Sequence, residues 1–294
     1  MHAVVIGAGI AGLATAALLG REGYEVTVVD SLDEVGGRAG SFAEAGFRWD
    51  TGPSWYLMPE AFDHFFALCG TSTEAELDLV DLSPAYRVFH GDAPVDVHSG
   101  IEEVTALFES LEPGAGEKVR AYLAQASDTY EMALKHFLYT TFSAPLNLVH
   151  RDIRTRISRL MALLTVNLKQ HVGRTFSDAR LRQILSYPAV FLSSEPAAAP
   201  ALYSLMSHTD LVEGVRYPQG GFAAVVQAIY RQARKFGATF RLGEEVTSIK
   251  VANRQVTGVY TNKGAIHADI VVSAADLHHT ETQLLPPQLR TCLL

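Results

Sequence analysis

The sequence predicts an α/β fold built around a Rossmann-like, nucleotide-binding domain. An apolar run at 3–6, a helical pattern at 9–20 and a β-branched run at 25–29 follow one another near the start of the chain. A G-x-G-x-x-G pattern lies between the first run and the helix, and an acid closes the last run. Strand, glycine turn, helix and strand in this order form the unit that binds dinucleotides. Residues 71–213 have a different organisation, for which we expect an α+β segment.

The glycine turn predicts where a diphosphate would bind. Gly7 can leave the strand in a sharp turn. Gly9 has no Cβ, so a diphosphate can approach the backbone, and Gly12 lets the helix lie close on the strand. Ile10 and Ala11 begin the helix, whose N-terminal N–H groups and partial positive charge favour phosphate.

Asp30 closes the second strand, 18 residues after Gly12. An acid at this distance can accept the hydroxyl groups of an adenosine ribose, and it disfavours a 2′-phosphate. We therefore expect NAD or FAD rather than NADP, and this βαβ unit does not distinguish between those two.

A second glycine-rich loop follows the second strand. Gly36 and Gly37 allow close backbone approach, and Arg38 provides a fork of donors for phosphate oxygens. We expect a short hairpin at 42–47, and Pro59 is typical of the first position of a helix.

The middle segment begins with a predicted hairpin at 86–98, followed by a helix that Ser99 would cap. Residues 135–182 carry nine Lys or Arg and two Asp, a net charge of +7 in a chain whose total is −8. Apolar residues are mixed with these basic ones, which is typical of a helix lying in a lipid headgroup layer. A solvated basic face over a buried apolar one is the alternative interpretation.

Strand and helix patterns return after residue 214, with Asp276 as a predicted helix cap. We expect a helix at 222–236 and strands at 239–242, 246–251, 255–260 and 268–273.

Composition excludes several classes of protein. The net charge of −8 disfavours nucleic-acid binding as a main role, and no apolar window is long enough to predict a membrane span. The two cysteines, Cys69 and Cys292, indicate a reducing compartment without a disulfide framework. The eleven histidines show no metal-ligand spacing, so we predict no metal site.

Several stretches together carry a family resemblance: IGAGIAGLATAALL, VGGRAG, FRWDTGPSWYLMPEAFD, RYPQGGFAAVVQAI and ADIVVSAADLHHTETQLL. They resemble the FAD-dependent phytoene desaturases of the bacterial and fungal type, within a wider group of flavoproteins that includes amine oxidases. The resemblance runs over nearly the whole chain. These enzymes continue with a closing glycine-rich segment that this sequence lacks, so we expect a chain truncated at its C-terminus.

The resemblance implies FAD as the cofactor and a discontinuous FAD-binding domain formed by 1–70 and 214–294, with 71–213 as an inserted substrate and membrane-facing domain. It also implies that Val246 holds the adenine edge through its backbone. Pro53, in a rigid turn of small residues, completes the expected cofactor-binding set.

The implied reaction is desaturation of a carotenoid precursor, phytoene to lycopene or intermediates. FAD accepts a hydride in such chemistry, and few catalytic side chains are needed. Arg151 and Asp152 form our candidate acid–base pair, with a surface ion pair as the alternative. A different flavin oxidase acting on amines, or a nucleotide-binding remnant without turnover, remain alternative functions.

A lipid-soluble carotenoid substrate resides in membrane. We therefore expect a cytoplasmic protein that associates peripherally with the membrane surface, through the basic and apolar residues of 135–182.

Overall fold

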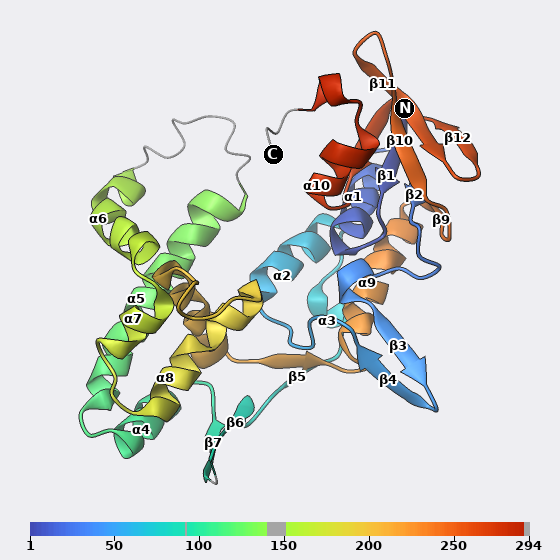
Figure 1. The fold of residues 1–294 in the computed structure, drawn as a ribbon. Helices are drawn as coiled ribbons and strands as arrows, with labels where there is room; N and C mark the ends of the chain where they lie inside the picture. Colours follow the sequence, from blue (N-terminus) through green and yellow to red (C-terminus); the bar gives the residue numbers. More distant parts are fainter. Residues whose placement is uncertain (92, 140–150, 291–294) are drawn as a thin grey trace. The chain divides into compact units, whose positions relative to one another are not determined.

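The computed structural model describes residues 1–91, 93–139 and 151–290 of the chain (Figure 1). Within these three ranges, no helix combines the length and the apolar character that crossing a bilayer requires. Cys69 is buried, whereas Cys292 lies outside the described residues.

The chain divides into two compact units. The first unit consists of Met1–Val80 and Tyr217–Leu294, and the second unit is Asp81–Arg216. Each unit has its own hydrophobic core.

The boundaries of the two units fall after Val80 and Arg216, inside two short strands that pair with each other. Neither strand was predicted, because three residues are too few to show a periodic pattern. These strands are β5 (Leu79–Asp81) and β8 (Arg216–Pro218).

The first unit contains the predicted βαβ segment and further strands and helices. Its strands outside β5 and β8 are β1 (His2–Ile6), β2 (Glu25–Val29), β3 (Ser41–Glu44), β4 (Phe47–Asp50), β9 (Thr239–Arg241), β10 (Val246–Ala252), β11 (Gln255–Thr261), β12 (Gly264–His267) and β13 (Ile270–Ser273). Its helices are α1 (Ile10–Arg21), α2 (Pro59–Leu68), α3 (Thr73–Glu76), α9 (Phe222–Lys235) and α10 (Leu277–His279), with a 3-10 turn at Gly37–Ala39.

A parallel sheet in the order β13–β1–β2–β9 forms the centre of the first unit. Side chains alternate across it, because successive residues of a strand point to opposite faces. Val5 belongs to the cluster that includes α1 and α9, whereas Val4 and Ile6 pack against the antiparallel sheet β10–β11–β12. Helices thus cover one face and a second sheet covers the other, which is a Rossmann-like arrangement.

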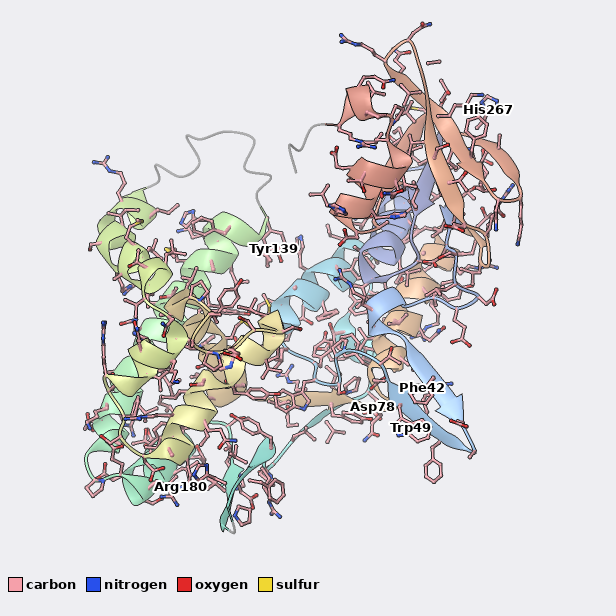
Figure 2. All side chains as sticks on the ribbon, viewed as in Figure 1. Phe42, Trp49, Asp78, Tyr139, Arg180 and His267 are labelled. Carbon is pink, nitrogen blue, oxygen red and sulfur yellow. The ribbon has the colours of Figure 1, made fainter. Side chains whose placement is uncertain are left out.

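The predicted hairpin near residue 45 is confirmed as β3 and β4. Ala45 and Gly46 form its turn with φ angles of 50° and 84°. Phe42 and Trp49 lie opposite each other on the two strands, with ring centroids 4.9 Å apart (Figure 2).

The second unit is mainly helical, with one hairpin. Its elements are β6 (Tyr86–His90), β7 (Ala93–Val97), α4 (Ile101–Leu111), α5 (Ala115–Ala133), α6 (Arg151–Thr165), α7 (Leu168–Gly173) and α8 (Ala179–Ser186). Short 3-10 or π-helical turns lie at Leu134–Leu138, Tyr187–Leu192, Ala201–Met206 and Thr209–Glu213.

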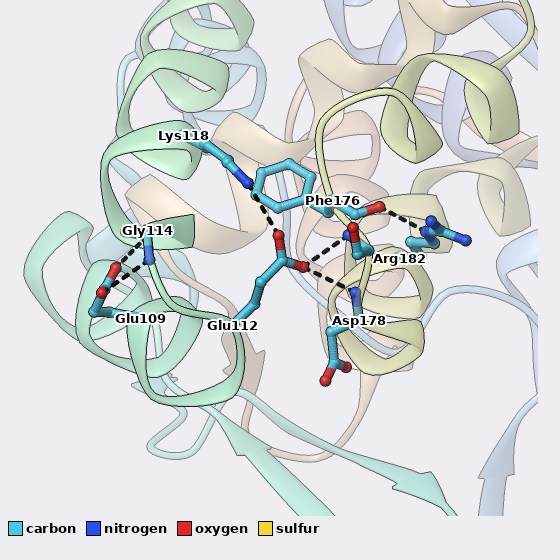
Figure 3. Close-up of polar contacts among 9 residues, drawn as sticks. Glu109, Glu112, Gly114, Lys118, Phe176, Asp178 and Arg182 are labelled. Atoms are coloured by element: carbon cyan, nitrogen blue, oxygen red, sulfur yellow. Dashed lines mark hydrogen bonds and ion pairs between the residues drawn. The ribbon is translucent and has the colours of Figure 1, made fainter.

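Two contacts in the second unit were not predicted. Ser99 does not cap α4; its hydroxyl donates to the carbonyl oxygen of Asp210 at 2.8 Å, and Gly100 is the N-cap. Glu112 accepts the N–H groups of Ser177 and Asp178 at 2.7 and 2.8 Å, just before α8 (Figure 3). Both contacts join segments that are far apart in the sequence, so no local sequence pattern predicts them.

Candidate functional site

The end of β1 and the start of α1 are in backbone contact. Gly7 has a φ angle of 101°, a conformation that favours glycine. A Cβ atom on Gly12 would lie 1.8 Å from the carbonyl oxygen of Gly7, so only glycine fits there. The sharp turn and the close helix packing expected of these two residues are both present.

The N-terminus of α1 is open. Its N-cap is Gly9, which has no side chain to accept the first N–H groups, and Ile10 and Ala11 follow as the first helical residues. A Cβ atom on Gly9 would have only the carbonyl oxygen of Gly36 nearby, at 3.8 Å. Because the first N–H groups of a helix lack intrahelical acceptors, this end attracts an anion.

Asp30 lies beside the glycine turn and makes contacts that the sequence did not predict. Its Oδ2 accepts the N–H of Ala8 at 2.6 Å, and its Oδ1 accepts the N–H of Leu32 at 2.8 Å. Each carboxylate oxygen has a further lone pair, so these bonds leave acceptor capacity for ribose hydroxyls. Asp30 thus also holds the glycine turn in place.

The second glycine-rich loop lies against the first. The N–H of Gly36 donates to the carbonyl oxygen of Ala8 at 2.9 Å, and Gly36 and Gly37 have φ angles of 123° and 55°. Arg38 is exposed, and no residue in the described part of the chain forms a hydrogen bond or an ion pair with its guanidinium. Its fork of donors is therefore available to a phosphate.

Val246 begins strand β10, which lies close to the end of β2. The N–H of Glu244 donates to the carbonyl oxygen of Asp30 at 2.9 Å, which brings the start of β10 to the end of β2. The Val246 side chain is buried. Pro53 is exposed in the turn after Gly52.

The candidate catalytic pair is not brought to this site by any described contact. Arg151 and Asp152 are the first two residues of α6, in the second unit. Their side chains lie outside the described residues, so their roles stay a prediction.

Asp50 is a residue near this region whose role could not be predicted from the sequence. Its carboxylate accepts the N–H groups of Phe222 and Ala223, at 2.9 and 3.3 Å, and so caps α9. The two partners are 172 and 173 residues from Asp50, a separation that no local sequence signal could reveal.

The open helix end, the space around Gly9 and Arg38, which has no partner in the described ranges, fit the diphosphate of a dinucleotide. Residues 10–291 match the family of flavin-containing amine oxidoreductases. The chain belongs to this family. A flavin-containing amine oxidoreductase has FAD as its cofactor.

Two relatives of this flavoprotein are named as carotenoid enzymes. The carotenoid 3,4-desaturase of Haloarcula japonica is 37% identical over 287 residues, which are 97% of this chain and 58% of the relative. The phytoene dehydrogenase of Streptomyces griseus is 37% identical over 282 residues, 94% of this chain and 54% of the relative. The chain spans little more than half the length of these relatives.

The fold of this flavoprotein is also similar to that of solved structures. An oxidoreductase from Methanosarcina mazei aligns with a TM-score of 0.60 at 20% identity, covering 97% of this chain and 61% of the other. At that identity the similarity shows the fold alone.

Proposed function

We propose that this chain is part of an FAD-dependent enzyme that desaturates a carotenoid precursor, with phytoene as the substrate. The observation that carries the proposal is the open N-terminus of α1, near an Arg38 that has no partner among the described residues. The chain is 37% identical to a carotenoid 3,4-desaturase and to a phytoene dehydrogenase. The anion site indicates a dinucleotide, and the relatives indicate the chemistry.

Bound FAD supplies the hydride acceptor that desaturation requires. The residues of the chain bind and orient this group. The N-terminus of α1 and Arg38 neutralise its diphosphate, and Asp30 accepts ribose hydroxyls. We assign Gly9 and Gly37 the role of leaving the backbone accessible, while Pro53 and Val246 border the site.

The second hydrogen of a desaturation leaves as a proton. We propose Asp152 as its acceptor, with Arg151 beside it to stabilise the carboxylate. Replacing Asp152 with Asn tests this role: we expect slower turnover with unchanged FAD affinity, and unchanged turnover would assign the pair to a surface contact.

We also infer that the second unit is the inserted substrate domain and that α6 contacts a membrane surface. Ile157, Met161 and Leu164 share one face of α6 and are each about half exposed, at 51%, 51% and 50%. Arg154 is exposed on the same helix. An exposed apolar face with nearby positive charge suits an anionic lipid surface, from which a carotenoid precursor would be loaded.

The reaction is tested with the full chain, FAD and phytoene in liposomes. We expect a flavin absorption spectrum after gel filtration and the appearance of longer polyenes. A chain that binds FAD but leaves phytoene unchanged would support the non-catalytic alternative. Oxidation of an amine instead of phytoene would place the chain with the amine oxidases of its family.

The membrane contact is tested by flotation with vesicles. We expect the wild-type chain to float with vesicles containing anionic lipid, and Met161→Glu to reduce that binding by about tenfold. Equal binding of the two proteins would contradict a role for this face of α6.

A further inference from the structure

Helices α1 and α9 pack against each other, but their N-termini differ in chemistry. Helix α1 begins after Gly9 without a side-chain cap. Helix α9 begins after Gly221, where the Asp50 carboxylate accepts the N–H groups of Phe222 and Ala223, at 2.9 and 3.3 Å. One helix end is thus open, and the other is occupied by a carboxylate.

The glycine before α9 makes room for this carboxylate. Gly221 has a φ angle of 80°, and a Cβ atom there would lie 2.9 Å from an oxygen of Asp50. The negative charge of Asp50 compensates the positive end of the α9 dipole. A phosphate is therefore disfavoured at α9, although a glycine pair precedes this helix as well.

The turn that follows Asp50 is in close backbone contact with the loop that carries Arg38. The N–H and the hydroxyl of Thr51 both donate to the carbonyl oxygen of Gly40, each at 2.9 Å. A Cβ atom on Gly52 would lie 2.0 Å from the carbonyl oxygen of Arg38. Movement of this turn would therefore move the backbone of Arg38.

The same loop touches the start of α1. A Cβ atom on Gly37 would lie 3.3 Å from the Cα of Gly9, and the N–H of Gly36 donates to Ala8 at 2.9 Å. The Asp50 carboxylate therefore joins α9 to its own turn, and backbone contacts continue from that turn through the Arg38 loop to the open end of α1.

We propose that Asp50 is a positioning residue for the diphosphate site: by fixing its turn to the start of α9, it sets the backbone of Arg38 against the open end of α1. The proposal rests on the FAD site proposed above. Both oxygens of Asp50 accept N–H groups of α9, so the proposed effect of Asp50 on the diphosphate is indirect and passes through the backbone of the Arg38 loop.

The second unit offers a matched control. Glu112 also accepts two backbone N–H groups before a helix, from Ser177 and Asp178, and its partners are likewise distant in sequence (Figure 3). Removing the Asp50 carboxylate removes the acceptor at the start of α9, which costs about 1 kcal/mol of stability. Removing the Glu112 carboxylate leaves the Asp178 cap of α8 in place, but it removes the two hydrogen bonds and the ion pair with Lys118. Of these two residues, only Asp50 belongs to the turn that contacts the Arg38 loop. Removing the Asp50 carboxylate should therefore lower the affinity for FAD, whereas removing the Glu112 carboxylate should not.

The test compares Asp50→Ala, Asp50→Asn and Glu112→Ala in the full chain. The FAD dissociation constant is measured by quenching of flavin fluorescence. Amide hydrogen exchange of residues 36–40 is measured without FAD, because that readout does not depend on the cofactor. Denaturant unfolding establishes how much stability each variant has lost.

We expect Asp50→Ala to raise the FAD dissociation constant by about tenfold and to speed exchange at residues 36–40. Asp50→Asn keeps one acceptor oxygen and should restore part of the affinity. Glu112→Ala should leave both readouts within about twofold of wild type.

Wild-type FAD affinity in Asp50→Ala, or an equal loss in Glu112→Ala, would overturn the proposal. If Asp50→Ala does not fold, Asp50→Asn decides the question by the same two measurements. If the wild-type chain binds no FAD, the proposed function fails, and unchanged exchange at residues 36–40 in the variants would separately overturn the role of Asp50.

Discussion

The Cβ position of Gly12 lies 1.8 Å from the carbonyl oxygen of Gly7. No side chain fits between the helix and the strand at this point. Gly9, three residues earlier in the same motif, has only one described atom within 4 Å of its Cβ position, at 3.8 Å. One glycine of the motif is thus required for packing and the other leaves space, so the two should respond differently to substitution.

Gly12→Ala is expected to destabilise the first unit by about 3 kcal/mol, because α1 must move away from β1 to accommodate a methyl group. Denaturant unfolding measures the loss. Gly173→Ala is the control, since its Cβ position has no described neighbour within 4 Å. Equal stability of the two variants would contradict the backbone contact.

Gly9→Ala is expected to leave the unfolding free energy within about 0.5 kcal/mol of wild type, because Gly9 has a φ angle of −73° that alanine adopts readily. FAD affinity should nevertheless fall by about tenfold, since the methyl group takes the space of the diphosphate. Fluorescence quenching measures the affinity. Unchanged FAD affinity would contradict binding of the diphosphate at this turn.

Asp128 pairs with two cations of α6. Arg156 and Arg159 both donate to its carboxylate, and these contacts lower the pKa of Asp128 to about 2. The stability from this cluster is present above the ordinary aspartate pKa and is lost as the pH falls toward 2. At pH 7, Asp128→Asn should cost about 1 kcal/mol, a value that allows for solvent screening.

The difference in unfolding free energy between wild type and Asp128→Asn should disappear in acid. Denaturant unfolding at pH 7 and near the lowered pKa of Asp128 measures this. The exposed pair of Arg87 and Asp96 is the control, and Asp96→Asn should change stability less. A difference that persists at low pH would mean that the carboxylate acts through packing and not through its charge.

Asp210 should show the opposite pH dependence. It is 2% exposed, and burial raises its pKa to about 7, although the Tyr86 hydroxyl donates to it at 3.2 Å. The unfolded chain ionises near the ordinary aspartate pKa, whereas the folded chain holds the proton until about pH 7. The free energy of unfolding should therefore fall as the pH rises across this window and level off above it.

Asp210→Asn removes the charge and keeps an acceptor for Tyr86. We expect this variant to be more stable than wild type at pH 8 and to lose that advantage toward pH 4, by about 1.4 kcal/mol for each pH unit at most. Unfolding in denaturant at these two pH values measures the difference in stability between the variant and wild type. A wild-type stability that rises between them would contradict a buried, neutral Asp210.

Much of the fold could be predicted from local patterns. Strand β2 was expected at residues 25–29 and lies at Glu25–Val29, because β-branched residues in a buried strand give a clear signal. Asp276 was expected to cap a helix and accepts the N–H groups of His278 and His279. Strand β12 was not predicted, because Gly264–His267 is short and shows little alternation of apolar and polar residues.

The expected cap at Ser99 was wrong for a different reason. Serine is a good cap, but its hydroxyl has another acceptor in the carbonyl oxygen of Asp210, which only the folded chain brings near. Propensity describes what a residue can do, and the tertiary neighbours determine which of its possible bonds forms.

The sequence by itself determined the βαβ unit, the glycine turn and the acid at Asp30, because each depends on residues close together in the chain. Only the tertiary structure decided that Asp50 closes the start of α9 while the start of α1 stays open. Two helices can carry similar glycines before their first turn, yet a carboxylate on a distant strand neutralises the start of α9, whereas the start of α1 has no side-chain cap and is the proposed anion site.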